Sequence, residues 1–136
     1  MKVVNHGGWF YYKSDNNYDF DKDKVGKWIF YFKSIDWAKN ICKKAIVDGV
    51  VDSCKHDEDS EGVICFYLNI DDFEGHKKII SWFLKNGMIK RTKKGQLTNI
   101  SFKLDKQTLS GQYNKKFTAP LKLDDMVDLQ SGSFIK

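Results

Sequence analysis

Apolar positions along the chain follow two periods, one typical of strands and one typical of helices. Residues 27–33 and 63–70 are rich in aromatic and β-branched side chains, a pattern that predicts two strands. From residue 35 to 46 and from 73 to 84 the apolar residues recur three or four positions apart, which predicts two amphipathic helices. Residues suited to begin and end a helix flank both segments: Ser34 and Gly49 for the first, Asp71 or Asp72 and Gly87 for the second.

Three further segments complete a predicted sheet. We expect residues 50–56 to form a strand that pairs with 63–70 across a short acidic loop. Residues 88–92 and 97–104 flank a Lys-Lys-Gly turn, which predicts a second hairpin. The order of elements indicates an α+β fold, in which a single antiparallel sheet carries two main helices on one face and leaves the other face open.

The length of the chain, 136 residues, is close to the usual size of one domain. Within this expected single domain we distinguish an aromatic and polar N-terminal arm (1–25), a core (26–113) and a C-terminal extension (114–136). Residues 1–24 are expected to form a short lead-in strand or arm and then a surface loop, because polar and turn-forming residues dominate this segment.

Composition and charge restrict the setting of the protein. The formal net charge of +5 is a moderate cationic excess. No apolar run is long enough to span a membrane and no signal peptide is evident, so we expect a cytoplasmic protein. The three cysteines show no CxxC spacing and are expected to stay reduced. A single Pro among many Lys, Asn, Ile and Asp residues is typical of an AT-rich bacterium or one of its phages.

The open face of the sheet is the predicted ligand surface. Ser53 and Lys55 share one face of their strand, and so do Ser101 and Lys103 of theirs. If both pairs point the same way, two ammonium groups and two hydroxyls converge and suit a phosphorylated anion. The alternative is that these lysines are solvated sheet residues without a ligand.

Aromatic residues are the second notable feature, with 4 Trp, 6 Tyr and 10 Phe in the chain. A ring beside a basic surface can stack on a nucleobase, although most such rings only pack against their neighbours. The rings that the apolar periods leave unassigned are Trp9, Tyr11, Tyr12, Tyr31, Tyr67 and Tyr113.

Catalytic and metal-binding patterns are weak in this sequence. Cys54 and His56 share a strand face, but residues two apart on a strand are poorly placed for a thiol–imidazole pair. The three histidines form no HxH or HExxH spacing, and no glycine-rich phosphate loop precedes a helix. We therefore predict neither a cofactor nor a metal site.

Several short segments between residues 26 and 113 carry a family resemblance. They are Gly26-Lys27-Trp28, Ser53-Cys54-Lys55-His56, Gly62-Val63-Ile64-Cys65-Phe66-Tyr67 and Asn99-Ile100-Ser101-Phe102-Lys103-Leu104-Asp105, followed by Thr108, Gly111 and Tyr113. In this order they resemble the phosphothreonine-lyase-domain family of bacteria, phages and eukaryotes.

The resemblance implies a curved antiparallel sheet with helices on its convex side, similar to the fold of the mRNA cap-binding initiation factor. The residues that it implies at or near the concave face are Lys55, Lys103, Thr108, Tyr113, Lys27 and Trp28. We do not carry the lyase activity over, because no Lys–His pair in a lyase-like setting is apparent. The cap-binding tryptophan pair cannot be placed on this chain either.

Three hypotheses for function stay open at this point. The first is a non-enzymatic protein that binds a nucleotide, a nucleotide signal or single-stranded RNA through Lys55 and Lys103, and that acts against host defence if a phage encodes it. The second is an enzyme of lyase or phosphotransfer type, with either lysine as base and His56 as acid. The third is an inhibitor or adaptor that binds a host protein through residues 1–24. The sequence does not indicate an oligomeric state.

Overall fold

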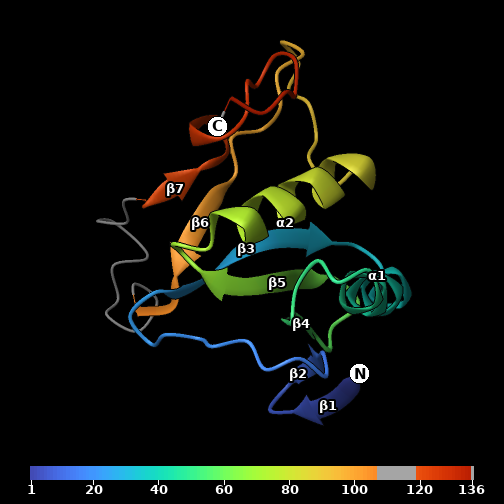
Figure 1. Ribbon diagram of the computed structural model, residues 1–136. Helices are drawn as coiled ribbons and strands as arrows, with labels where there is room; N and C mark the ends of the chain where they lie inside the picture. Colours follow the sequence, from blue (N-terminus) through green and yellow to red (C-terminus); the bar gives the residue numbers. More distant parts are fainter. Residues whose placement is uncertain (107–118, 136) are drawn as a thin grey trace.

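The computed structural model describes residues 1–106 and 119–135 (Figure 1). Its elements follow in the order β1 (Lys2–His6), β2 (Trp9–Lys13), β3 (Val25–Phe32), α1 (Ile35–Val47), β4 (Ser53–Asp57), β5 (Gly62–Asn69), α2 (Phe73–Lys85), β6 (Ser101–Leu104), β7 (Leu121–Lys122) and a short 3-10 helix (Leu123–Asp125). Within the described residues one antiparallel sheet of seven strands forms, in the order β1-β2-β4-β5-β3-β6-β7. The predicted α+β class is confirmed.

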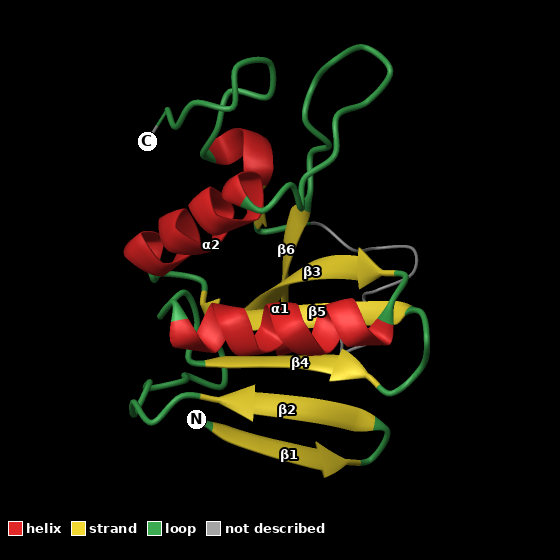
Figure 2. Ribbon diagram, turned by 90° about the vertical axis from the view of Figure 1, so that its right-hand side faces the viewer, coloured by secondary structure: helices red, strands yellow, loops and turns green. Residues whose placement is uncertain are grey.

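Both helices cover the same face of this sheet. Figure 2 shows α1 in front of β4 and β5 and running along them, with α2 on the same side of the strands. Ser34 begins α1 and Asp72 begins α2, each accepting a hydrogen bond from a backbone N–H of the first turn, as the sequence predicts. At 13 residues each, neither helix has the length or the apolar character to cross a bilayer, and the described part of the chain has no other helix that does.

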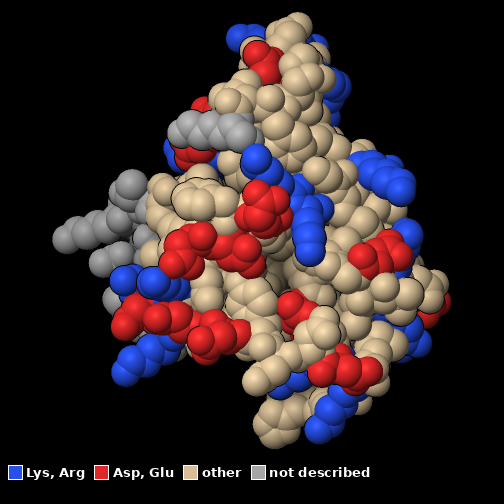
Figure 3. Space-filling view, viewed as in Figure 1, with Lys and Arg blue, Asp and Glu red and all other residues tan. Residues whose placement is uncertain are grey.

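Charged side chains of both signs cover the surface. Figure 3 shows acidic and basic groups side by side on the face that Figure 1 presents. The net charge of +5 therefore does not gather into one continuous patch on that face.

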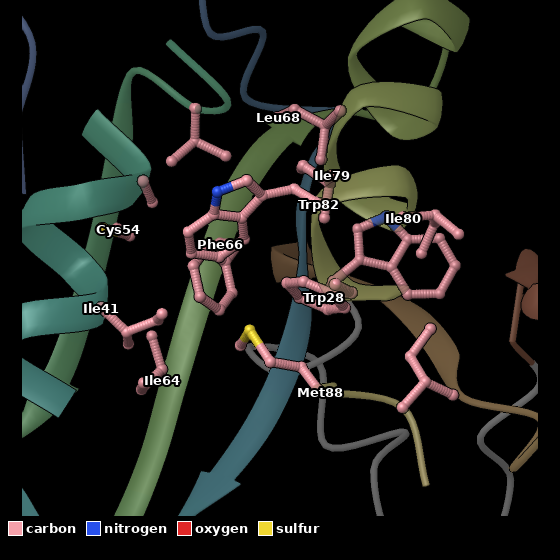
Figure 4. Close-up of a cluster of buried hydrophobic side chains, with 14 of the residues drawn as sticks. Trp28, Ile41, Cys54, Ile64, Phe66, Leu68, Ile79, Ile80, Trp82 and Met88 are labelled. Carbon is pink, nitrogen blue, oxygen red and sulfur yellow. The ribbon is translucent and has the colours of Figure 1, made fainter. Parts of the chain in front are cut away.

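A buried aromatic centre joins β3, β6 and α2. Trp28 of β3 is fully buried, and its indole Nε1–H donates to His76 Nδ1 of α2 at 3.0 Å. His76 Nε2 lies 2.8 Å from the carbonyl oxygen of Ile70, which can only accept, so this nitrogen carries the proton of a neutral imidazole. The Phe102 ring of β6 packs edge-on against both Trp28 and His76. Apolar side chains from β5 and α2 surround Trp28, among them Phe66, Ile79 and Ile80 (Figure 4).

A second buried histidine fastens the N-terminal strands to the sheet. His56 of β4 is fully buried, and its Nε2 accepts from the Tyr12 hydroxyl of β2 at 2.9 Å. Its Nδ1 donates to the carbonyl oxygen of Asp57 at 2.7 Å, and burial lowers the pKa of this imidazole, which favours the neutral form. The Phe10 ring stacks on His56 with the ring centres 5.2 Å apart. Residues 2–13 are thus an integral part of the sheet.

The N-terminal arm differs from its prediction, because it forms the two strands β1 and β2 instead of a lead-in strand. Gly7 and Gly8 form the two-residue turn between β1 and β2, and both have the positive φ that such a turn requires. All five residues of β1 are exposed, since it is the edge strand of the sheet. An edge strand that is exposed on both faces shows no alternation of apolar and polar residues, so its sequence pattern does not predict it.

The hairpin predicted over residues 88–92 and 97–104 forms only beside its turn and does not extend into two paired strands. The turn itself forms and Arg91 and Leu97 pair across it as an isolated bridge. Two backbone hydrogen bonds flank this bridge, from the Thr92 N–H to the carbonyl oxygen of Gln96 and from the Thr98 N–H to that of Lys90. The Leu97 N–H points out of the hairpin in this register and donates to the carbonyl oxygen of Leu129. The last part of the segment, β6, pairs with β3 and β7.

Protonation of the two buried histidines should destabilise the fold in mild acid. Burial lowers the pKa of His56 and of His76 below the ordinary 6.5, so the unfolded chain binds protons more readily than the folded one. The free energy of unfolding is then fully retained above pH 6.5 and falls below it, by at most about 1.4 kcal/mol per histidine and pH unit. Urea titrations at about pH 7.5 and about pH 5.5 measure this fall. His6→Gln, an exposed control, should keep it and His76→Gln should weaken it, whereas equal stability at both pH values would contradict the assignment.

Gly26 of β3 is required by close packing. A Cβ atom there would lie 2.5 Å from the carbonyl oxygen of Lys103 and 2.6 Å from the Phe102 ring. We expect Gly26→Ala to lower the free energy of unfolding by about 1–3 kcal/mol, because the paired backbone cannot retreat easily. Chemical denaturation checks this, with Ser101→Ala on the other face of β6 as a control of small effect. A Gly26→Ala variant as stable as the parent would show that β6 does not pack this closely.

Candidate ligand-binding face

The sheet face opposite the helices, here called the open face, combines lysines with aromatic rings. Successive strand residues point to opposite faces, so the neighbours of the buried core residues lie here. Lys27 of β3 pairs with Tyr67 of β5 on one side and with Lys103 of β6 on the other. Lys55 of β4 pairs in the same way with Tyr11 of β2 and with Cys65 of β5. The open face also carries Trp9, Lys13, Ser53, Ile29 and Ser101.

Three rings surround the ammonium group of Lys55. Its Nζ lies 4.0 Å from the centre of the Trp9 ring, 5.6 Å from that of Tyr11 and 5.8 Å from that of Tyr67. These distances are within the range of cation–π attraction. All four side chains are half-buried, so the cluster reaches the surface.

Lys27 forms the second cationic position. Its Nζ makes an ion pair with Asp105 at 2.8 Å and lies 5.8 Å from the centre of the Tyr67 ring. Tyr67 therefore lies close to the ammonium groups of both Lys27 and Lys55. Burial raises the pKa of the Tyr67 phenol, which keeps its proton and can donate a hydrogen bond.

Lys103 is nearly buried on this face, with 6% of its surface exposed. Burial is the main cause that lowers its pKa, and the neighbouring positive charge of Lys27 adds to this effect.

A cavity of about 440 Å³ lies at one end of the open face. The loop between β2 and β3 forms one wall, and the ends of β2, β4 and β5 form the floor. Its lining residues are Tyr11, Lys13, Ser14, Asn16, Asn17, Tyr18, Phe20, Val25, Asp52, Ser53, Tyr67 and Asp105. This volume is within the usual range for small-molecule sites.

The structure assembles most of the predicted site residues but not all of them. Those that it places on the open face are Lys27, Ser53, Lys55, Ser101 and Lys103. Trp28 and His56 lie on the covered face and are fully buried, so neither belongs to this surface. Thr108 and Tyr113 lie outside the described residues.

The acid–base pair of the enzyme hypothesis, Lys55 with His56, is not assembled. The two residues are neighbours in β4, so their side chains point to opposite faces of the sheet. His56 is also fully buried, with both ring nitrogens occupied by Tyr12 and Asp57. Across the described parts of the chain, no three His, Cys, Asp or Glu side chains gather as a metal site would need.

Several residues of the cluster were not predicted as site residues. Trp9, Tyr11 and Tyr67 were among the unassigned rings, but the sequence did not connect them with Lys55. Strand parity was the available signal, because Trp9 and Tyr11 share a parity within β2 and pair with the open-face residues of β4. The pairing of β2 with β4 had to be known first.

Comparison with known proteins assigns the chain to no family: no protein-family model, no curated protein and no solved structure matches it. The resemblance to phosphothreonine-lyase-domain proteins and to the cap-binding fold therefore stays a prediction.

Removing the charge of Lys27 should raise the pKa of Lys103. Lys27→Gln eliminates the positive neighbour and releases Asp105 from its ion pair, and both effects favour protonated Lys103. Heteronuclear NMR of the lysine side chains measures this pKa, which should move toward 10.5, the ordinary value. Lys43→Gln on the exposed side of α1 is the control. An unchanged pKa in Lys27→Gln would contradict the close approach of the two lysines.

Proposed function

We propose that this protein binds a phosphorylated nucleotide unit on its open face, as a free nucleotide or as part of single-stranded RNA. The observation that carries the proposal is the position of Lys55 and Lys27, each close to the Tyr67 ring. Trp9 and Tyr11 lie beside Lys55. Cations recognise phosphate and exposed rings recognise bases, so one surface offers both parts of nucleotide recognition.

The phosphate would be held by Lys27, Lys55 and the phenol of Tyr67. Lys55 and Lys27, the latter ion-paired with Asp105, would supply positive charge to a terminal phosphate, and the protonated phenol would supply a directional donor. The near burial of Lys103 beside them limits solvent screening in this part of the face.

The base would stack on Trp9 or Tyr11. The Lys55 Nζ lies 4.0 Å from the centre of the half-buried Trp9 ring, and such a contact contributes about 0.5–2 kcal/mol, depending on how far it is desolvated. A bound phosphate can draw this flexible side chain away at small cost and leave the ring face to a base. Stacking of one base on an aromatic side chain contributes about 1–3 kcal/mol.

The geometry favours binding over the two other hypotheses. The acid that the enzyme hypothesis needs, His56, lies on the other face of the sheet. The arm that the adaptor hypothesis needs is itself paired into the sheet and brings Trp9 and Tyr11 to the open face. If a phage encodes the chain, sequestering a nucleotide signal of host defence is the role that such binding would serve.

Lys55→Gln should weaken nucleotide binding about tenfold, because it removes one charge-assisted contact to phosphate while keeping the length of the side chain. Isothermal titration calorimetry with the four nucleoside 5′-monophosphates and a short single-stranded RNA measures the effect. Lys43→Gln, which removes the same charge from the exposed side of α1, should bind like the parent. Equal losses of affinity in both variants would show that binding depends only on the net charge of the protein, which would contradict a site at Lys55. No binding by the unmodified protein would refute the proposal.

A further inference from the structure

We infer that the ligand is a nucleotide with phosphate on one side of its nucleoside only, seated with the nucleoside in the end cavity and the phosphate on Lys27 and Lys55. This inference rests on the proposed function and specifies its ligand. It separates a free mononucleotide, or the terminal nucleotide of an RNA, from an internal nucleotide of a chain.

The cavity and the two lysines adjoin through shared side chains. Tyr11 and Tyr67 line the cavity and also lie within 6 Å, at 5.6 Å and 5.8 Å, of the Lys55 ammonium group. Asp105 lines the cavity too, and it is the partner of Lys27. Both cations are thus at the rim of the cavity, and a ligand inside it can reach them with one end.

The far wall of the cavity is held in place by its own hydrogen bonds. The Ser14 hydroxyl and the Asn16 amide both donate to one carboxylate oxygen of Asp52, at 2.7 Å and 3.1 Å. The Tyr18 hydroxyl, further along the same loop, donates to Asp72 at 2.8 Å and accepts from the backbone N–H of Asn69. These hydrogen bonds hold the wall in one conformation before a ligand binds, so its shape is preorganised.

The lining suits a nucleoside better than a phosphate. The rings of Tyr11, Tyr67 and Phe20 offer flat apolar surface to a base, and Phe20 is 38% exposed. The carboxylates of Asp52 and Asp105 accept hydrogen bonds from base amino groups or ribose hydroxyls.

The Asp52 carboxylate repels a second phosphate. Asp105, the other carboxylate of the lining, is compensated by its ion pair with Lys27 at the rim, and Lys13 is the one lysine in the lining itself. An internal RNA nucleotide carries phosphate on both sides and would bring one of them toward Asp52. The lining thus selects against the continuous chain while the rim attracts a single phosphate.

Calorimetry on the unmodified protein tests this selection directly. The 5′-monophosphate that binds best is compared with its 3′-monophosphate isomer and with the matching 3′,5′-bisphosphate. We expect one of the monophosphates to bind about tenfold more tightly than the bisphosphate, because the second phosphate meets the Asp52 carboxylate. A surface that only attracts anions would bind the bisphosphate more tightly, and that result would overturn the inference.

Two variants locate the effect in the cavity. Asp52→Asn keeps an oxygen that can accept from Ser14 and Asn16 but removes the charge, and should bring bisphosphate affinity closer to that of the monophosphate. Phe20→Ala should weaken the monophosphate about tenfold through loss of stacking. Phe134→Ala, of similar exposure at 37% and absent from the cavity lining, is its control. Parent-like behaviour of both Asp52→Asn and Phe20→Ala would overturn the placement.

Failure of this inference is distinguishable from failure of the proposed function. If single-stranded RNA with a phosphate at both ends binds in a Lys55-dependent way and no mononucleotide does, the open face binds nucleic acid and the cavity assignment is wrong. If neither class of ligand binds, the proposed function fails together with the inference.

Discussion

The hydrogen bond between Trp28 and His76 fixes which way the central strand faces. Trp28 must point toward α2 to reach the imidazole, and the partner of His76 Nε2, the carbonyl oxygen of Ile70, holds that ring in one tautomer. Because side chains alternate along a strand, Lys27 is then obliged to point away from the helices. A shift of one residue would bury Lys27 in the core, which its charge forbids.

The open face acquires its chemistry from the same register. Pairing across β3 sets Lys27 between Tyr67 and Lys103, and pairing across β4 sets Lys55 beside Tyr11. Because helices cover one face of the sheet, its other face is in contact with solvent and must be largely polar. On this open face the lysines lie close together among aromatic rings. Most of the other lysines are on turns and helix surfaces, where solvent and neighbouring carboxylates balance them.

The spacing of apolar residues predicted those helices and strands that bury one face in the core. Both helices, their caps at Ser34 and Asp72, and the central strands follow from apolar spacing and short-range chemistry. Parity predicted that Ser53 and Lys55 share one face and that Ser101 and Lys103 share one face, but only the pairing through β5 and β3 places both pairs on the same face. Long-range pairing is what the sequence could not supply. The exposed strand β1 has no pattern, and the partner of β6 depends on the fit of its backbone against Gly26.

Mapping of a nucleotide onto the protein by amide and indole NMR shifts tests the central claim most directly. A competing basic surface exists on the helix side, in a groove between α1 and α2 lined by Lys44, Lys77, Lys78 and Lys85. If the open face is the ligand surface, adding a 5′-mononucleotide will shift the Trp9 indole and the amides of Tyr11, Lys55 and Tyr67, and will leave the helix lysines unchanged. Shifts confined to the α2 lysines, with the open face silent, would contradict the account.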